Sequence, residues 1–260
     1  MLEDYRYFIR LAFDGTRYHG WQRQRNALSV QQLLEESMSM MLRVPIKLNG
    51  AGRTDAGVHA KEYFAHFNVK DVIVQSALKK LVFKLNSYLD QDIVIYDIFQ
   101  VSDDISARFT AISRTYKYFI STRKNPFREK FTHYIFNNLD VDLMNQGAEI
   151  IMGFDDFTSF SKVDTDTKTN ICKIFHAKWE WDGDELIFTI TANRFLRNMV
   201  RSIVGTLLDI GIGKMTLAEL KEVIDSKNRS NAGDSVPACG LFLYSISYPE
   251  GIVAEKLPGH

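Results

Sequence analysis

Hydrophobic and polar residues alternate in the N-terminal part of the chain in the pattern that is typical of β-strands. Between residues 5 and 13 every second residue is apolar, which predicts a first strand. Ser29 followed by Gln32 resembles a capping box and predicts the start of a helix with one apolar face. The expected order is a strand at 5–13, a helix after Ser29, strands at about 46–50 and 62–69, a helix at about 75–87 and a strand at 93–101.

The C-terminal part of the chain shows the same order of elements. Its clearest signal is Asp182-Gly183-Asp184, which predicts a hairpin turn between two strands. The expected elements are a strand at about 114–121, a helix at about 140–152, strands at 174–181 and 186–192, helices at about 195–210 and after Thr216, and a strand at 241–248. Each half therefore reads β-α-β-β-α-β, the ferredoxin-like order.

This order predicts an α+β protein built from two ferredoxin-like halves. We expect residues 1–105 to form the N-terminal half, which carries the loop at residues 50–60, and residues 106–260 to form the C-terminal half, which completes the cleft between them. Side by side, the two sheets would make one extended, mainly antiparallel sheet with helices on one face and a central cleft. The duplication rests on element order, because no sequence repeat is visible.

One loop contains the side chains most suited to chemistry. Residues 50–60 read Gly-Ala-Gly-Arg-Thr-Asp-Ala-Gly-Val-His-Ala, which places Asp55 between Arg53 and His59. Glycines let a backbone approach a ligand closely, and a loop between two strands is a rigid support. An aspartate beside a fixed cation stays ionised, as a nucleophile or base requires. Asp-Gly loops are also common as simple turns, so the loop alone leaves both interpretations open.

The same loop differs from the common phosphate-binding and metal-binding patterns. Asp55 stands where a dinucleotide fingerprint has its third glycine, and the Gly-Lys-Ser/Thr ending of a P-loop is absent. Asp55 and His59 are metal-ligand types, but no third or fourth ligand has a convincing spacing. We therefore expect no metal.

The composition is that of a globular protein with a large core. Of 260 residues, 45% are hydrophobic and 25% are charged, and 32 basic residues balance 32 acidic ones. Cys172 and Cys239 form no CxxC pattern, which argues against a disulfide framework and fits a reducing compartment. The N-terminus lacks the features of a signal peptide, and no apolar run has membrane-spanning length. We expect a cytoplasmic protein that does not associate with membranes.

Basic residues are concentrated locally although the net charge is zero. Residues 106–130 contain seven basic residues against one acidic residue. Arg194, Arg197 and Arg201 have i, i+3, i+7 spacing, which predicts a basic face on the helix expected at 195–210. Arg23 belongs to a third group that is interleaved with aromatic residues. Such surfaces suit nucleic acid, since cations neutralise phosphates and rings stack on bases; the alternative is that each is an ordinary solvated surface.

Five motifs are spread over nearly the whole chain. They are residues 13–24 (Phe-Asp-Gly-Thr-Arg-Tyr-His-Gly-Trp-Gln-Arg-Gln), the Asp55 loop with its Gly-Arg-Thr-Asp-Ala-Gly-Val-His core, residues 114–118 (Arg-Thr-Tyr-Lys-Tyr), residues 195–201 (Phe-Leu-Arg-Asn-Met-Val-Arg) with Val204-Gly205 following, and residues 237–241 (Pro-Ala-Cys-Gly-Leu). Together and in this order they resemble the TruA family of tRNA pseudouridine synthases.

The resemblance implies a cofactor-free isomerisation of uridine to pseudouridine in the anticodon stem-loop of tRNA, at positions 38, 39 and 40. It implies that tRNA is the partner, that the protein is a homodimer, and that one tRNA contacts both subunits. It also implies two ferredoxin-like halves around a basic cleft, in agreement with the order of elements.

Individual residues take their expected roles from this resemblance. Asp55 matches the catalytic aspartate, whose carboxylate attacks either the ribose carbon 1′ or the base; the sequence leaves both routes open. Tyr116 matches an active-site tyrosine that stacks on the base and assists the late proton transfer, and Arg201 matches an arginine that pairs with the aspartate. Arg53 matches a residue that holds the target nucleotide out of the stack, and Leu241 an apolar wall of the base pocket.

Other residues have weaker assignments. Arg23, Arg194 and Arg197 are expected to contact RNA, with Arg194 and Arg197 less fixed in the family pattern than Arg201. His59 either orders the loop through hydrogen bonds or touches RNA, and Trp21 either stacks on RNA or anchors the first loop.

Two other classes of protein compete with a modifying enzyme. A non-catalytic RNA-binding or chaperone protein on a ferredoxin-like scaffold would share the basic and aromatic surfaces. Asp55 discriminates against it, because a protein that only binds gains nothing from an anion facing RNA phosphates. A nucleotide-dependent enzyme is disfavoured, because the chain lacks a phosphate-binding loop.

Overall fold

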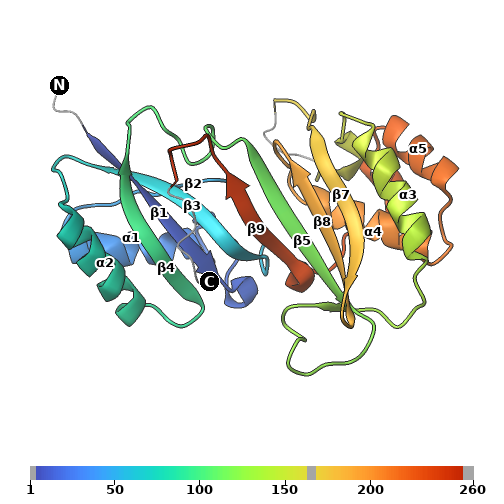
Figure 1. The fold of residues 1–260 in the computed structure, drawn as a ribbon, viewed down its shortest axis with the longest axis horizontal. Helices are drawn as coiled ribbons and strands as arrows, with labels where there is room; N and C mark the ends of the chain where they lie inside the picture. The colour runs from blue at the N-terminus through green and yellow to red at the C-terminus, as the bar shows by residue number, and fades with distance from the viewer. Residues whose placement is uncertain (1–3, 163–167, 254–260) are drawn as a thin grey trace.

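The computed structural model describes residues 4–162 and 168–253, and its main feature is one long sheet (Figure 1). The sheet order is β4-β1-β3-β9-β5-β8-β7, with β2 paired to β3 and β6 paired to β5. The strands are β1 (Tyr5–Phe13), β2 (Asn49–Gly50), β3 (His59–Val69), β4 (Ile93–Val101), β5 (Ser113–Ser121), β6 (His133–Tyr134), β7 (Ile174–Asp182), β8 (Glu185–Ala192) and β9 (Leu241–Ser247). Two of the pairings between these strands, β3 with β9 and β5 with β6, are parallel, and the others are antiparallel.

Helices cover one face of this sheet in two groups (Figure 1). The N-terminal group is α1 (Val30–Leu42) and α2 (Gln75–Tyr88), and the C-terminal group is α3 (Val141–Met152), α4 (Met199–Gly211) and α5 (Leu217–Asp225). In each half the first strand of the unit lies between its fourth and third strands, which is the ferredoxin-like arrangement. The predicted α+β class with two ferredoxin-like halves and an extended, mainly antiparallel sheet is confirmed.

The last strand of the chain, β9, lies in the middle of the sheet and joins the two halves (Figure 1). It pairs with β5 along most of its length, but with β3 through only His59↔Phe242 and Ala60↔Leu243. Two hydrophobic clusters correspond to the two halves, and the N-terminal cluster includes Leu243 from β9. The division between residues 1–105 and 106–260 remains a prediction.

The strand expected at 46–50 is shorter than its apolar pattern suggested. Ile46 and Leu48 are buried as expected, yet only residues 49 and 50 pair with β3. The backbone before them bonds to side chains of α1: the Ile46 N–H donates to Ser39 Oγ and the Leu48 N–H donates to Glu35 Oε1. Because these donors are already satisfied by a helix, residues 46–48 do not extend the sheet ladder.

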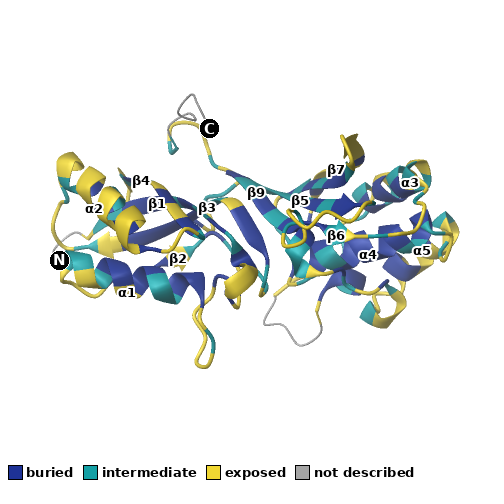
Figure 2. Ribbon diagram, turned by 90° about the horizontal axis from the view of Figure 1, so that it is seen from below, coloured by how far each residue is buried: buried dark blue, intermediate teal, exposed yellow. Residues whose placement is uncertain are grey.

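The helix expected at 195–210 begins later, at Met199, so the prediction that Arg194, Arg197 and Arg201 share one helical face is wrong. Asn198 has a left-handed backbone with φ 65°, which stops the helix from extending toward residue 195. Its side-chain amide donates to Ser235 Oγ at 2.5 Å, so a tertiary contact fixes this start. Arg194 and Arg197 lie in the irregular segment before α4. The residues of α4 itself are mostly buried (Figure 2).

The predicted cap of α1 is half formed. Ser29 Oγ accepts a hydrogen bond from the Gln32 N–H, but the Gln32 side chain donates to Glu36 and not back to Ser29. A complete capping box occurs at α5, where Thr216 and Glu219 each bond to the backbone of the other. Among the described helices, none is both long and apolar enough to cross a membrane.

Buried His66 makes the stability of the N-terminal half depend on pH. Its Nδ1 accepts the Ala107 N–H at 3.1 Å, and its ring stacks on Phe8. Burial, with a smaller effect of the Arg6 charge, lowers the pKa of His66 to about 4. An unfolded histidine with a pKa near 6.5 binds a proton first, so folding stability is lost as the pH falls from about 6.5 toward 4.

We expect His66→Asn to remove this dependence, because an asparagine can still accept the Ala107 N–H but does not titrate. Between pH 7 and pH 5 the wild type should lose about 2 kcal/mol more unfolding free energy than the variant. Urea unfolding at the two pH values measures the difference. Equal losses in the two proteins would show that His66 is protonated at no extra cost in the folded state.

Candidate active site

Asp55 lies in a turn that the N-terminal motif supports from one side. The Val58 N–H donates to the Asp55 carbonyl at 3.2 Å, and Gly57 takes φ 79° within this turn. The Gly57 N–H donates in turn to the Tyr18 carbonyl, at 3.2 Å. The glycine is needed because a side chain at positive φ would strain the turn.

The segment around Gly20 packs directly against the residue before Asp55. The Trp21 N–H donates to Thr54 Oγ1 at 3.0 Å, and a Cβ atom on Gly20 would lie only 2.1 Å from the Thr54 carbonyl oxygen. Trp21 is 1% exposed and stacks on Tyr63 with the ring centroids 4.2 Å apart. Of its two expected roles, Trp21 therefore has that of an anchor for the first loop.

Two arginines from the C-terminal half approach the Asp55 carboxylate. Arg201 Nη1 lies 3.4 Å from Oδ2, and Arg197 Nε lies 3.9 Å from Oδ1. Charged hydrogen bonds of this kind are usually 2.7–2.9 Å long, so the carboxylate is oriented without being held in a tight bidentate pair. The Asp55 side chain is 25% exposed, which leaves its oxygens accessible.

Arg201 is itself held by the segment that precedes β9. Its Nε donates to the Val236 carbonyl at 2.7 Å, and the Val236 N–H donates back to the Arg201 carbonyl. Gly205, one turn further along α4, permits this packing, since a Cβ there would lie 1.8 Å from the Asp234 carbonyl oxygen. The expected pairing of Arg201 with Asp55 is therefore present, although the offset start of α4 was not foreseen.

Tyr116 on β5 is the third member of this group. Burial and, next, the negative charge of Asp55 raise the pKa of the Tyr116 phenol well above its ordinary value of 10. The phenol therefore stays protonated at neutral pH and can act as a hydrogen-bond donor. Its ring meets Phe195 edge to face at 5.1 Å between centroids, and Phe195 lies in the segment that carries Arg197.

Arg114 was predicted only as a member of the motif at 114–118 and of the basic segment at 106–130, without a role of its own. Its guanidinium donates to four backbone carbonyls and to no carboxylate in the described part of the chain. These carbonyls belong to Ala51 at 3.2 Å, Asn193 at 2.9 Å, Arg108 and Ala111. Burial lowers the pKa of Arg114. The sequence feature that could have indicated a role near the site is its position two residues before Tyr116.

His59 is enclosed by protein, with 1% of its side chain exposed. Nδ1 lies 3.1 Å from the donating Gly15 N–H, and Nε2 lies 3.2 Å from the Cys239 carbonyl. The ring stacks on Phe242, with the centroids 4.5 Å apart. Burial lowers its pKa. Of the two expected roles, the structure gives His59 loop ordering, and the expectation that it touches RNA does not fit its burial.

The other expected RNA-binding residues lie in different surroundings. Arg53 is exposed and takes part in none of the ion pairs found between described residues. Arg23 pairs with Glu35 and Glu36 of α1, while Arg194 lies in the same segment as Arg197 but does not reach Asp55. Leu241 is 5% exposed and packs in the C-terminal hydrophobic cluster. Their roles toward RNA stay predictions.

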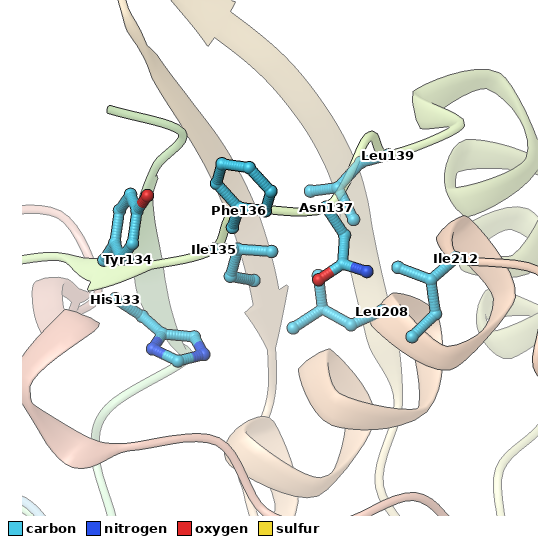
Figure 3. Close-up of a pocket in the computed structure, with 8 residues that line it drawn as sticks. All are labelled: His133, Tyr134, Ile135, Phe136, Asn137, Leu139, Leu208 and Ile212. Carbon is cyan, nitrogen blue, oxygen red and sulfur yellow. The ribbon is translucent and has the colours of Figure 1, made fainter. Parts of the chain in front are cut away.

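Three further features lie outside this group of residues: the Cys239 thiol, the distribution of metal-ligating side chains and a cavity. Burial raises the pKa of the Cys239 thiol, which makes it a poorer nucleophile at neutral pH. No group of three or more metal-ligating side chains occurs in residues 4–162 and 168–253. A cavity of about 280 Å³ is lined by residues 133–137 and Leu139 of one segment and by Leu208 and Ile212 from the region of α4 (Figure 3). It contains none of the expected site residues.

Comparison with known proteins defines the class. The profile of the tRNA pseudouridine synthase family matches residues 148–249. Such enzymes are isomerases that act on uridine in tRNA.

Full-length relatives identify the family. A protein of Bacteroides thetaiotaomicron named tRNA pseudouridine synthase A is 48% identical, over 96% of this chain and 93% of its own. Namesakes from Parabacteroides distasonis and Clostridium acetobutylicum are 48% and 38% identical, over 94% and 92% of this chain and 96% and 98% of their own. The chain belongs to the tRNA pseudouridine synthase A (TruA) family, as its motifs predicted, and is a tRNA-modifying isomerase.

The contact of Gly20 with Thr54 provides a test of the loop support. We expect Gly20→Ala to destabilise the fold by about 2 kcal/mol or more and to lower pseudouridine formation, because the new Cβ clashes with a carbonyl and the residue needs φ 80°. Gly52→Ala is the matched control, since a Cβ there meets nothing within 4 Å. Thermal unfolding and a pseudouridine assay measure both effects. Equal stability and equal activity of the two variants would show that the segment around Gly20 does not support the Asp55 loop.

Proposed function

We propose that this chain converts uridine to pseudouridine in the anticodon stem-loop of tRNA, at positions 38, 39 and 40, with Asp55 as the nucleophile. The observation that carries the proposal is the placement of a partly exposed carboxylate between two arginines, Arg197 and Arg201. A protein that only binds RNA has no use for an anion at this point. The named relatives support tRNA as the substrate.

The reaction rearranges bonds within one nucleotide. Asp55 attacks the ribose carbon 1′ or the base, the bond between carbon 1′ and nitrogen 1 breaks, and the uracil rotates. A new bond then joins carbon 1′ to carbon 5, the bond to Asp55 is released, and the proton leaves carbon 5 as nitrogen 1 gains one. Because uridine and pseudouridine are isomers, atoms and electrons balance without a co-reactant, and the proposal includes no cofactor.

The neighbours of Asp55 take complementary parts in this scheme. Arg201 orients the carboxylate through a contact long enough to leave both oxygens reactive. Tyr116 stacks on the flipped base and offers its hydroxyl for the late proton transfer. Arg53, exposed near the loop, holds the target nucleotide out of the stack.

The contacts outside this centre are part of the same proposal. Arg23, Arg194 and Arg197 bind tRNA phosphates, and Leu241 forms an apolar wall beneath the base. We also propose a homodimer in which one tRNA contacts both subunits, and a cytoplasmic location, where tRNA is modified. Phe127 and Phe136 are 89% and 87% exposed, and we expect such a dimer to cover them.

Asp55→Asn tests the nucleophile. The change keeps the shape of the side chain but removes its charge, so we expect tritium release from carbon 5 of uridine to fall at least about a thousandfold. Binding of tRNA should be retained, because a negative charge facing phosphates is lost. Asp184→Asn, in an exposed hairpin turn, is the control.

The same assay separates the alternatives. Mapping the modified uridines on a tRNA pool tests positions 38, 39 and 40. Release by Asp55→Asn at the wild-type rate would exclude Asp55 as the nucleophile. Binding without release by the wild type would favour an RNA-binding protein.

Tyr116→Phe tests the hydroxyl apart from the ring. Phenylalanine preserves the contact with Phe195 but cannot transfer a proton, so we expect kcat to fall about 10²-fold or more with little change in KM. Single-turnover kinetics with saturating enzyme measures the chemical step. An unchanged rate would limit Tyr116 to stacking.

A further inference from the structure

The loop that carries Asp55 belongs to the N-terminal half, yet both of its ends bond to the C-terminal half. Before Asp55, the Ala51 carbonyl accepts a hydrogen bond from Arg114 on β5 at 3.2 Å. After Asp55, His59 Nε2 lies 3.2 Å from the Cys239 carbonyl. Ala51 and His59 are each four residues from Asp55, so the loop is held symmetrically about its reactive residue.

Arg114 and His59 are also connected to Arg201, the partner of Asp55, through backbone carbonyls of the C-terminal half. Arg114 also donates to the Asn193 carbonyl, and Asn193 begins the segment that leads to Arg197 and α4. One guanidinium therefore ties the leading end of the Asp55 loop to the chain that presents both arginines. A planar group with five donors suits this task, because it bonds to several fixed carbonyls at once.

His59 connects to Arg201 by a second route. Its acceptor, the Cys239 carbonyl, lies three residues after Val236, whose carbonyl holds Arg201 Nε at 2.7 Å. The imidazole cannot easily reorient, because it stacks on Phe242 and contacts Phe131. Its Nδ1 lies 3.1 Å from the Gly15 nitrogen and 3.0 Å from Asp14 Oδ1, and the Cys239 carbonyl can only accept, so the cross-half bond uses a proton on Nε2.

These bonds matter because the backbone joins the halves only weakly at this point. The ladder between β3 and β9 contains two residue pairs, and the Asp55–Arg201 contact of 3.4 Å is too long to fix the spacing by itself. A shift of about 1 Å in a reacting group is enough to slow catalysis strongly.

We propose that Arg114 and His59 are positioning residues that set the distance and orientation of Asp55 relative to Arg201 across the junction of the two halves. The proposal rests on the proposed role of Asp55. In this proposal His59 does not contact RNA. Loss of its side chain should therefore lower kcat and leave KM for tRNA unchanged.

Two substitutions of His59 separate its two hydrogen bonds. The amide nitrogen of glutamine lies where His59 Nε2 lies and can donate to the Cys239 carbonyl. The amide oxygen of asparagine lies where Nδ1 lies and can only accept the Gly15 N–H. We expect His59→Gln to retain kcat within about threefold and His59→Asn to lose at least tenfold, both with unchanged KM. His66→Gln, at a buried histidine of the same half, controls for general destabilisation and should leave kcat unchanged.

Arg114→Lys tests the other end of the loop. A lysine keeps the charge but cannot reach the Ala51 and Asn193 carbonyls together, so we expect a loss of at least tenfold in kcat without a change in KM. Single-turnover rates and thermal unfolding are measured on every variant. The proposal is overturned if rates follow stability alone, if KM rises instead of kcat falling, or if His59→Asn and His59→Gln lose activity equally.

The experiments distinguish a failure of Asp55 as the nucleophile from a failure of the positioning proposal. If Asp55→Asn remains active, the proposed nucleophile fails and with it the premise of the positioning. If Asp55→Asn is inactive while His59→Asn and Arg114→Lys react at the wild-type rate, only the positioning proposal fails.

Discussion

The attraction between Asp55 and Arg201 connects two parts of the chain that are 146 residues apart and belong to different halves of the sheet. Neither half contains a complete site. The carboxylate comes from a loop of the N-terminal unit, whereas its cations and Tyr116 come from the C-terminal unit. The geometry of the site therefore depends on how firmly the two units are held, and the fold solves this by placing the last strand of the chain between them.

The last strand, β9, can lie between the two units because β2 is short. In a complete ferredoxin-like sheet the strand equivalent to β2 would cover the edge of β3. Here β2 ends at Gly50, which pairs with Ala65, and the chain then leaves the sheet as the Asp55 loop, so the His59 end of β3 remains free to pair with β9. The departure of the Asp55 loop from the sheet thus leaves room for the strand that joins the two units.

Much of this structure could be predicted from the sequence where the controlling interactions are local. The hairpin at Asp182-Gly183-Asp184 and the alternation of 5–13 depend on neighbouring residues, and both elements formed as expected. The start of α4 could not be predicted, because Asn198 is fixed by Ser235, which is 37 residues away. The enclosure of His59 was hidden for the same reason, since Gly15, Phe242 and Cys239 reach it only in the folded chain.

The identity of the site residues had a different origin. Asp55, Tyr116 and Arg201 were predicted from motif resemblance; the structure pairs Arg201 with Asp55, and the charge of Asp55 contributes to the raised pKa of Tyr116. Arg114 received no separate role, because an arginine that binds carbonyls has the same sequence appearance as one that is solvated. Only the geometry distinguishes them.

The bonding of Arg114 has an electrostatic consequence. Carbonyl dipoles satisfy its hydrogen-bonding groups but carry no net charge, so its positive charge is not cancelled. Arg197 and Arg201 face the negative charge of Asp55, and Arg114 adds a third positive charge at the start of its loop, so these four side chains carry a net charge of +2 in a protein whose formal net charge is zero. Such a field draws a polyanion toward the junction and weakens as salt is added, since the screening length is about 8 Å at physiological ionic strength. A neutral protein can thereby capture its substrate quickly at one place without binding polyanions over its whole surface.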